Sequence, residues 1–326
     1  MPLLELRDEG LYCAPGGFYI DPWGPVDRAV ITHAHPDRAR PGSKSYLTSN
    51  DGEALLRMRL GPQAVIQAVA YGESLTLGEA RVTAYPAGHM LGSAQIRIEH
   101  AGEVWVFSGD YKLASDSTCA GWEPAPCDVF VTEATFGLPI FRWPSAGEVR
   151  DSIHAWWRAN QQAGRASLLF ANPLGKAQRL LALIDSALGP IFVHEEIERV
   201  NQIYRARGVQ LAGARLGDGE KGWAGALVLA PPEAHASAWA KRFGTASTAL
   251  ASGWMRIRGT RRRRSLDRGF VLSDHADWSG LLSAVEASGA ESVWVVSGFR
   301  GPMVRWLAEH GRRSISVDTR FGEAEP

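Results

Sequence analysis

The chain has 326 residues, 45% of them hydrophobic, and its 35 basic residues balance 35 acidic ones. Such a chain can bury a full core, as one large domain or as two unequal ones. The start, MPLLELRDEG, has acids where a secretory signal would be basic and then apolar, and no apolar run reaches the length of a membrane span. We therefore expect a soluble, cytoplasmic protein with no membrane partner.

Short apolar or β-branched runs that end in polar loops recur along the chain, a pattern typical of buried strands whose carboxyl ends carry the chemistry. In chain order they are RAVITH (28–33), ARVTAYPAGH (80–89), EVWVFSGD (103–110), DVFVTEA (128–134), SLLFANP (167–173), GFVLSDH (269–275) and SVWVVSG (292–298). Helical stretches lie between them, at 50–61, 146–164 and 175–189, each closed by glycine and the first with an Asn or Asp cap. The alternation predicts a mixed α/β fold, with a second α/β unit inserted from residue 145 to about 255.

Metal-ligating side chains are predicted where the first three runs end. His33, His35 and Asp37 follow one strand, and because alternate residues of an extended segment point to one side, both imidazoles can converge on one cation. His89 and Asp110 end the next two runs. Singly, each residue has a structural explanation, since GD is a common turn pair and a histidine before a turn is often only hydrogen-bonded. Jointly they supply four ligands of the kind that suits Zn²⁺ or Mn²⁺.

Cysteine and arginine are the other distinctive residues. The three cysteines, Cys13, Cys119 and Cys127, form no CxxC pair, which argues against disulfides and against a thiolate zinc site. Seven arginines fall within residues 256–268, beside the single acid Asp267. That run is either a solvated loop or a phosphate-binding one.

The order HxHxD, GH and GD resembles the metallo-β-lactamase fold, an αββα sandwich with metals at one edge of its two sheets. VTEATFG and LSDHADW look like the acidic and histidine motifs of the β-CASP nucleases within it. With IDPWG, VITHAHPDRAR, PAGHMLGSAQ, SGDYK, LGKAQR and ASGWMRIR, they are similar to the bacterial ligase-associated DNA exonucleases, relatives of the Artemis-type DNA repair nucleases. The resemblance covers nearly the whole chain. It implies a metallo-β-lactamase domain over 1–144 and 258–326, interrupted by a β-CASP α/β domain over 145–257.

The resemblance also implies roles for single residues. The first metal site matches His33, His35, His89 and Asp110. Asp37 lies between two metal sites and orients the nucleophile, a metal-bound hydroxide, and Asp21 matches a buried aspartate that supports the histidine loop. Glu133 and His275 match a pair in which the acid orients an imidazole toward the scissile phosphate or the leaving oxygen. The catalytic set is therefore Asp37, Asp110, Glu133 and His275.

Two positions depart from the family pattern. The family has histidine where this chain has Arg38, and often also where it has Ser297. Both histidines would bind a second metal, and two carboxylates without imidazole make a weak zinc site. We therefore predict one tightly held metal per chain. Arg38 then either binds substrate phosphate in place of the second metal, or is a surface or ion-pairing arginine, with Asp37 as a partner, in a decayed enzyme.

Substrate contacts are predicted at a second place. LFANPLGKAQRL reads as strand, glycine loop and helix, which would present free N–H groups, with Gly175 and Lys176, to a phosphate. The alternative is that the two residues only cap a helix. Trp254 is a candidate for stacking a base.

Taken together, these features predict a metal-dependent DNA exonuclease that acts in DNA repair on single-stranded or end-containing DNA. The resemblance implies an ATP-dependent DNA ligase and a helicase as partners. Two alternatives stay open: a degenerate DNA-binding repair subunit, and an RNA-processing β-CASP nuclease.

Overall fold

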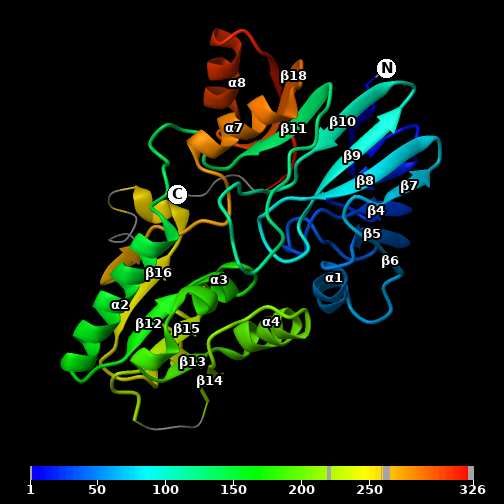
Figure 1. Ribbon diagram of the computed structural model, residues 1–326. Helices are drawn as coiled ribbons and strands as arrows, with labels where there is room; N and C mark the ends of the chain where they lie inside the picture. Colours follow the sequence, from blue (N-terminus) through cyan, green and yellow to red (C-terminus); the bar gives the residue numbers. More distant parts are fainter. Residues whose placement is uncertain (1, 219–221, 258, 260–264, 322–326) are drawn as a thin grey trace. The chain divides into compact units, whose positions relative to one another are not determined.

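The protein is described here by a computed structural model that covers residues 2–218, 222–257, 259 and 265–321. Its chain forms two compact units (Figure 1). Of the described residues, one unit contains those up to Phe141 and those from His275 to Phe321, and the other contains those within Arg142–Asp274. No helix among the described residues is long and apolar enough to cross a membrane.

The first unit contains two β-sheets. One has the strand order β1 (Leu4–Arg7), β2 (Gly10–Cys13), β3 (Phe18–Ile20), β4 (Arg28–Val30), β5 (Ser45–Ser49) and β6 (Ile66–Val69). The other has the order β19 (Arg313–Ser316), β18 (Ser292–Gly298), β11 (Val129–Ala134), β10 (Glu103–Phe107), β9 (Ala94–His100), β8 (Ala80–Pro86) and β7 (Ser74–Leu77).

Strand alternation places the two sheets face to face with helices outside them. In β10, Trp105 and Phe107 enter the core that both sheets share, whereas Val106 points to the outer face. That outer face packs against α7 (Trp278–Ser288) and α8 (Arg300–Glu309). On the other sheet, α1 (Glu53–Leu60) packs Leu56 against Ile31.

Strand direction brings the polar loops of this unit to one edge of the larger sheet. Because β9 is antiparallel to both β8 and β10, those two strands point the same way, and β11 is parallel to β10. The segments that leave β8 and β10, and the end of β11, therefore lie at the same edge. They carry His89, Asp110 and Glu133.

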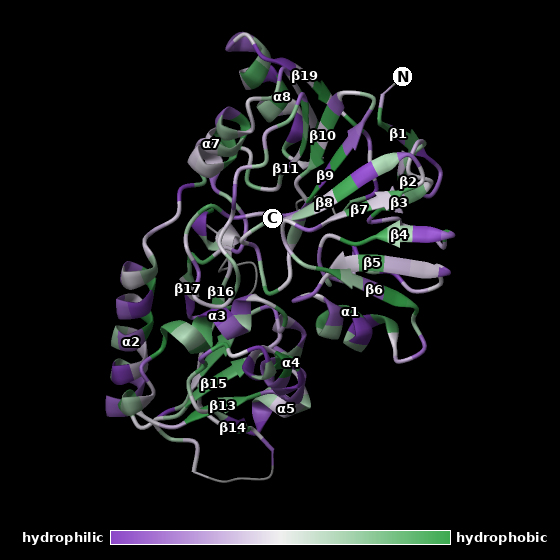
Figure 2. Ribbon diagram, turned by 45° about the vertical axis from the view of Figure 1, so that its right-hand side comes forward, coloured by the Kyte–Doolittle hydropathy of each residue, from purple (hydrophilic) through white to green (hydrophobic). Residues whose placement is uncertain are grey.

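The second unit is built on a parallel sheet with the order β14 (Arg215–Leu216), β13 (Ile191–Val193), β15 (Leu227–Ala230), β12 (Ser167–Phe170), β16 (Ser247–Ala251) and β17 (Arg268–Phe270). One face packs against α2 (Ala146–Gln162), α3 (Lys176–Leu183) and α4 (Glu195–Ala206). Residues beside α5 (Ala238–Lys241) cover the other face. Buried on both sides, β13 and β15 are coloured hydrophobic in Figure 2. Short 3₁₀ turns, η1 (Ser186–Leu188), η2 (Pro232–Ala234) and η3 (Gly253–Arg256), complete the unit.

The mixed α/β prediction is confirmed, and several boundaries need correction. The second unit runs beyond residue 257 to Asp274, because β17 pairs with β16. The helix expected to start on an Asn or Asp cap starts after Gly52, without a side-chain cap. The helix expected over 175–189 ends at Leu183, since Ile184 is extended and Asp185 caps a separate turn.

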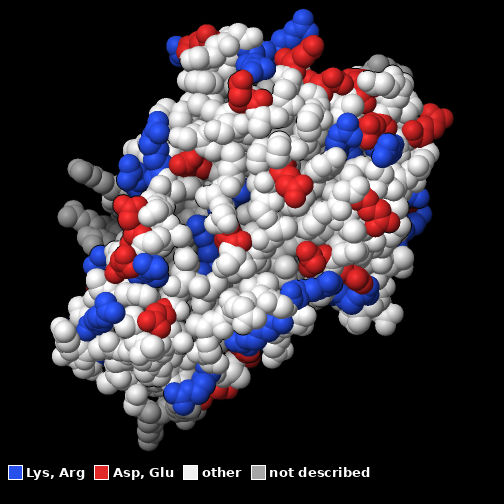
Figure 3. All heavy atoms as spheres, viewed as in Figure 1, with Lys and Arg blue, Asp and Glu red and all other residues white. Residues whose placement is uncertain are grey.

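Two of the three cysteines have raised thiol pKa values, and charged side chains of both signs lie on the surface. The three cysteines, all among the described residues, form no disulfide bond, and burial raises the pKa of the Cys13 thiol to about 11 and that of Cys127 to about 12, so both stay protonated near neutral pH. On the face shown in Figure 3, basic and acidic side chains are interspersed. Most of the arginine run, Arg258 and residues 260–264, lies outside the described residues.

Candidate metal centre

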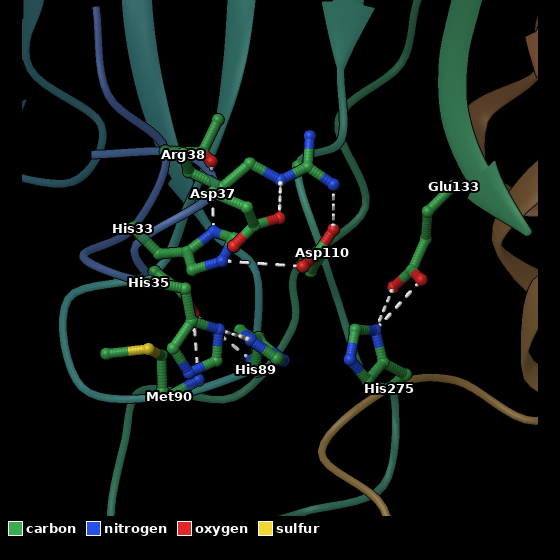
Figure 4. A network of polar contacts seen from close by, with 12 residues as sticks. His33, His35, Asp37, Arg38, His89, Met90, Asp110, Glu133 and His275 are labelled. Carbon is green, nitrogen blue, oxygen red and sulfur yellow. Dashed lines mark hydrogen bonds and ion pairs between the residues drawn. The ribbon is translucent and has the colours of Figure 1, made fainter. Parts of the chain in front are cut away.

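Three imidazoles converge at the edge where these loops meet (Figure 4). His33 and His35 leave the end of β4, and His89 leaves β8. The ring centroids lie 4.9 Å apart for His33 and His35, 4.8 Å for His33 and His89, and 5.0 Å for His35 and His89. Asp110, which follows β10, places Oδ2 3.4 Å from His33 Nε2. One ligand atom of each of these four residues lies within 4.8 Å of the others, so the four predicted ligands are brought together.

The chemistry of this cluster fits a divalent cation. His33 Nδ1 lies 3.0 Å from the Thr32 hydroxyl, while its Nε2 is buried and has no hydrogen-bond partner among the described residues. Burial and the neighbouring histidines hold the pKa of His89 well below its ordinary value, so this imidazole is neutral and able to bind a metal. Burial alone would raise the pKa of Asp110, but Arg38 and His33 outweigh it and hold the pKa well below normal.

Asp21 contacts the residue that precedes the first histidine, and its supporting role stays a prediction. Its two carboxylate oxygens accept from the Thr32 backbone N–H at 2.8 Å and the Thr32 hydroxyl at 2.6 Å, one residue before His33. The residue is fully buried and has a positive φ of 43°, which Asp tolerates better than most side chains. Burial raises its pKa to about 6, against the opposing charges of Arg38 and His33.

Glu133 and His275 form a second group beside the first. His275 Nδ1 lies 2.9 and 3.0 Å from the two oxygens of Glu133, and the Tyr111 backbone N–H donates to the same carboxylate at 2.9 Å. Glu133 is 1% exposed, while the His275 side chain is 20% exposed and its ring lies 4.8 Å from that of His89. A buried carboxylate thus fixes one ring nitrogen of a part-exposed histidine beside the cluster.

The Arg38 guanidinium is buried among carboxylates, whereas the sequence predicted a contact with substrate phosphate. The residue is 3% exposed, and its Nη2 donates to Asp110 Oδ1 at 2.6 Å. Its Nε lies 3.4 Å from Asp37 Oδ2. Carboxylates from three separate loops surround the buried guanidinium. The local sequence around Arg38 does not indicate this arrangement. Asp37 itself is part-exposed beside the cluster, and Ser297, opposite Glu133 in the β11–β18 pairing, is buried.

At the second predicted phosphate site, in the other unit, both predicted groups already have partners within the protein. The Gly175 N–H donates to Gln178 Oε1 at 2.8 Å and is therefore taken, because Gln178 folds back over the start of α3. Lys176 Nζ lies 3.5 Å from Asp274 Oδ2, and Arg179 Nη1 lies 3.5 Å from Asp274 Oδ1. Sequence reasoning missed both Asp274 and Arg179, which no motif connects. Trp254 lies in η3.

Comparison with known proteins gives relatives among nucleic-acid enzymes. No family model matches the chain. It is 30% identical over 320 residues to a protein of Opitutus terrae named "Probable DNA ligase", a match that spans 97% of this chain and 31% of that protein. It is 34% identical over 166 residues to "Endoribonuclease YSH1" of Gibberella zeae, spanning 50% of this chain and 20% of the relative. It is 32% identical over 124 residues to "Cleavage and polyadenylation specificity factor subunit 3" of Dictyostelium discoideum, spanning 37% and 16%.

These relatives fit the β-CASP and metallo-β-lactamase family that the sequence resembles, and the chain spans about a third or less of their lengths. Among solved structures, a protein of unknown function from Enterococcus faecalis V583 superimposes with a TM-score of 0.62 at 10% identity, over 91% of this chain and 80% of that one. At that identity the likeness concerns the fold alone.

Proposed function

We propose that the chain is a metal-dependent DNA exonuclease of the metallo-β-lactamase and β-CASP type, acting on single-stranded or end-containing DNA during repair. The observation that carries the proposal is the pairing of a four-ligand cluster with the Glu133–His275 group beside it. A helix-flanked pair of sheets with this cluster at one edge is the arrangement expected of the fold. The relative named "Probable DNA ligase", which matches 97% of this chain, supports DNA as substrate and a ligase as partner.

In the proposed phosphodiester hydrolysis, different residues of the site bind the metal, orient water and assist the leaving oxygen. His33, His35, His89 and Asp110 would hold one Zn²⁺ or Mn²⁺, and such a cation would supply Lewis acidity to activate water and to offset charge on the phosphate. Asp37, part-exposed beside the cluster, orients the attacking water. With Nδ1–H bonded to Glu133, His275 would donate a proton from its other ring nitrogen to the leaving oxygen as the P–O bond breaks.

An RNA-processing nuclease is the second candidate, and the relatives named "Endoribonuclease YSH1" favour it. Purified protein incubated with end-labelled single-stranded DNA and RNA of one sequence distinguishes the two. We expect nucleotides to be removed from DNA ends, EDTA to stop the reaction, and added Zn²⁺ or Mn²⁺ to restore it. Cleavage of RNA alone would select the second candidate. Binding of DNA without cleavage at any metal concentration would indicate a degenerate DNA-binding subunit.

Lys176 provides a test of the substrate contacts. If its ammonium binds a DNA phosphate at the start of α3, Lys176→Ala weakens binding and lowers the slope of log affinity against log salt by about 1. Fluorescence anisotropy across salt concentrations measures both quantities. Arg305→Ala is the matched control, because Arg305 is an exposed cation paired with Glu309. An unchanged slope in Lys176→Ala would mean that Lys176 serves only its ion pair with Asp274.

A further inference from the structure

The guanidinium of Arg38 lies among three aspartates that come from separate parts of the chain. Nη2 is 2.6 Å from Asp110 Oδ1, Nε is 3.4 Å from Asp37 Oδ2, and Nη1 is 3.9 Å from Asp21 Oδ2. Asp21 follows β3, Asp37 follows β4, and Asp110 follows β10. An arginine stays charged at every pH at which a protein is folded. It is therefore a permanent cation at the end of the histidine cluster.

An aromatic ring from the end of the chain closes over this cation. The Arg38 Cζ lies 4.0 Å from the centroid of the Phe321 ring, and both residues are 3% exposed. The segment that leads to Phe321 is fixed, since the Val317 N–H donates to the Val295 carbonyl at 3.0 Å. Phe321 also packs against Phe107, with ring centroids 6.0 Å apart. The guanidinium is thus held by carboxylates at its edge and by an aromatic face.

The two oxygens of Asp110 face two different groups, Arg38 and His33. Oδ1 accepts from Arg38, and Oδ2 faces His33 Nε2, inside the cluster (Figure 4). A second divalent cation on the Asp37 side would need Asp110 Oδ1 and Asp37 Oδ2, and both oxygens face Arg38. Its charge would also lie beside that of the buried guanidinium, where like charges repel more strongly than in bulk water.

We propose that Arg38, covered by Phe321, is a built-in cation that restricts the centre to one divalent metal and turns Asp110 Oδ2 toward it. Arg38 is thus a positioning residue that does not touch substrate. The inference rests on the proposed function in one respect only, that the histidine cluster holds a metal. It does not depend on what the enzyme cleaves.

Metal stoichiometry tests this inference without an activity assay. We expect metal-free parent protein, titrated with Mn²⁺ and followed by electron paramagnetic resonance, to bind one equivalent. Arg38→Met removes the charge and frees the carboxylates, which suit Mn²⁺, so a second equivalent should bind. Its first equivalent should bind roughly 10- to 100-fold more weakly, because Asp110 loses the partner that orients it. Arg38→Lys keeps the charge and should bind one equivalent, and Arg305→Met, at an exposed site, is the matched control.

Each outcome decides the inference. Two equivalents in the parent or in Arg38→Lys would overturn it, and so would parent-like binding in Arg38→Met. If Arg38→Met does not fold, Arg38→Gln keeps a hydrogen-bond donor without the charge, and the same two results are expected of it. A parent that binds no metal refutes the metal centre together with this inference. A parent that binds one metal and cleaves nothing refutes only the nuclease.

Discussion

Replacing His89 by alanine is expected to release the metal and to lower cleavage by about three orders of magnitude or more, equivalent to about 4 kcal/mol of transition-state stabilisation. The side chain is buried at the centre of the cluster, with its ring 4.8 Å from His33 and 5.0 Å from His35. Alanine leaves two imidazoles and Asp110, one ligand short of a four-ligand site. Elemental analysis after dialysis and a DNA cleavage assay measure the two losses.

The fold should survive this change. The His89 backbone N–H keeps its bond to the Ser93 hydroxyl, at 3.1 Å, whatever the side chain. His310→Ala is the matched control, because His310 is exposed just after the end of α8 and stacks on Trp306. It should keep full metal content. A His89→Ala protein that holds metal and cleaves at the parental rate would refute the cluster as the catalytic centre.

The same variant should change how the metal-free protein responds to acid. The pKa of His89 is lowered well below its ordinary value of 6.5, chiefly by burial, so the unfolded chain takes up this proton before the folded one does. The His89 side chain therefore lowers the stability of the metal-free parent as pH falls below about 6.5, and has no such effect above it. His89→Ala lacks this contribution, and thermal unfolding followed from about pH 8 to about pH 5 would show the difference.

The strand-end residues were predictable because their positions follow from local patterns. Each ends an apolar run, and in a sheet whose strands run parallel or alternate, such ends gather at shared edges. That is why His33, His35, His89 and Asp110 were found from sequence. The structure shows that these four residues lie close together. That they bind a metal remains a proposal.

The surroundings of Arg38 were not predictable in the same way. Its position in HAHPDR suggested a substrate contact, yet the groups that bury it, Asp21, Asp110 and Phe321, are far from it in sequence. Hydrophobic periodicity carries no information about such pairing. The same holds for β17, whose pairing with β16 extends the second unit to Asp274. Gly175 differs, because its N–H is taken by Gln178 only three residues later, a local capping pattern.

Removing the charge of Glu133 is expected to slow cleavage by two to four orders of magnitude and to leave the metal in place, the range typical of a lost general acid. Both oxygens of Glu133 lie within 3.0 Å of His275 Nδ1, and the Tyr111 N–H donates to one of them. The carboxylate therefore fixes which ring nitrogen carries the proton, orients the ring, and stabilises its charged form. Glu133→Gln keeps the size and one acceptor but loses the charge.

A double-mutant cycle shows whether Glu133 acts through His275. If it does, His275→Ala already removes what the carboxylate supports, and Glu133→Gln combined with His275→Ala should be about as slow as His275→Ala alone. Single-turnover rates for the parent, both single variants and the double variant give this comparison. Elemental analysis of the same proteins measures their metal content. This second measurement is needed because Asp110, Glu133 and His275 also lie close enough to share a cation. If Glu133→Gln loses the metal, or if the two rate losses multiply, Glu133 has a role independent of His275, and the proposal that it acts through His275 is wrong.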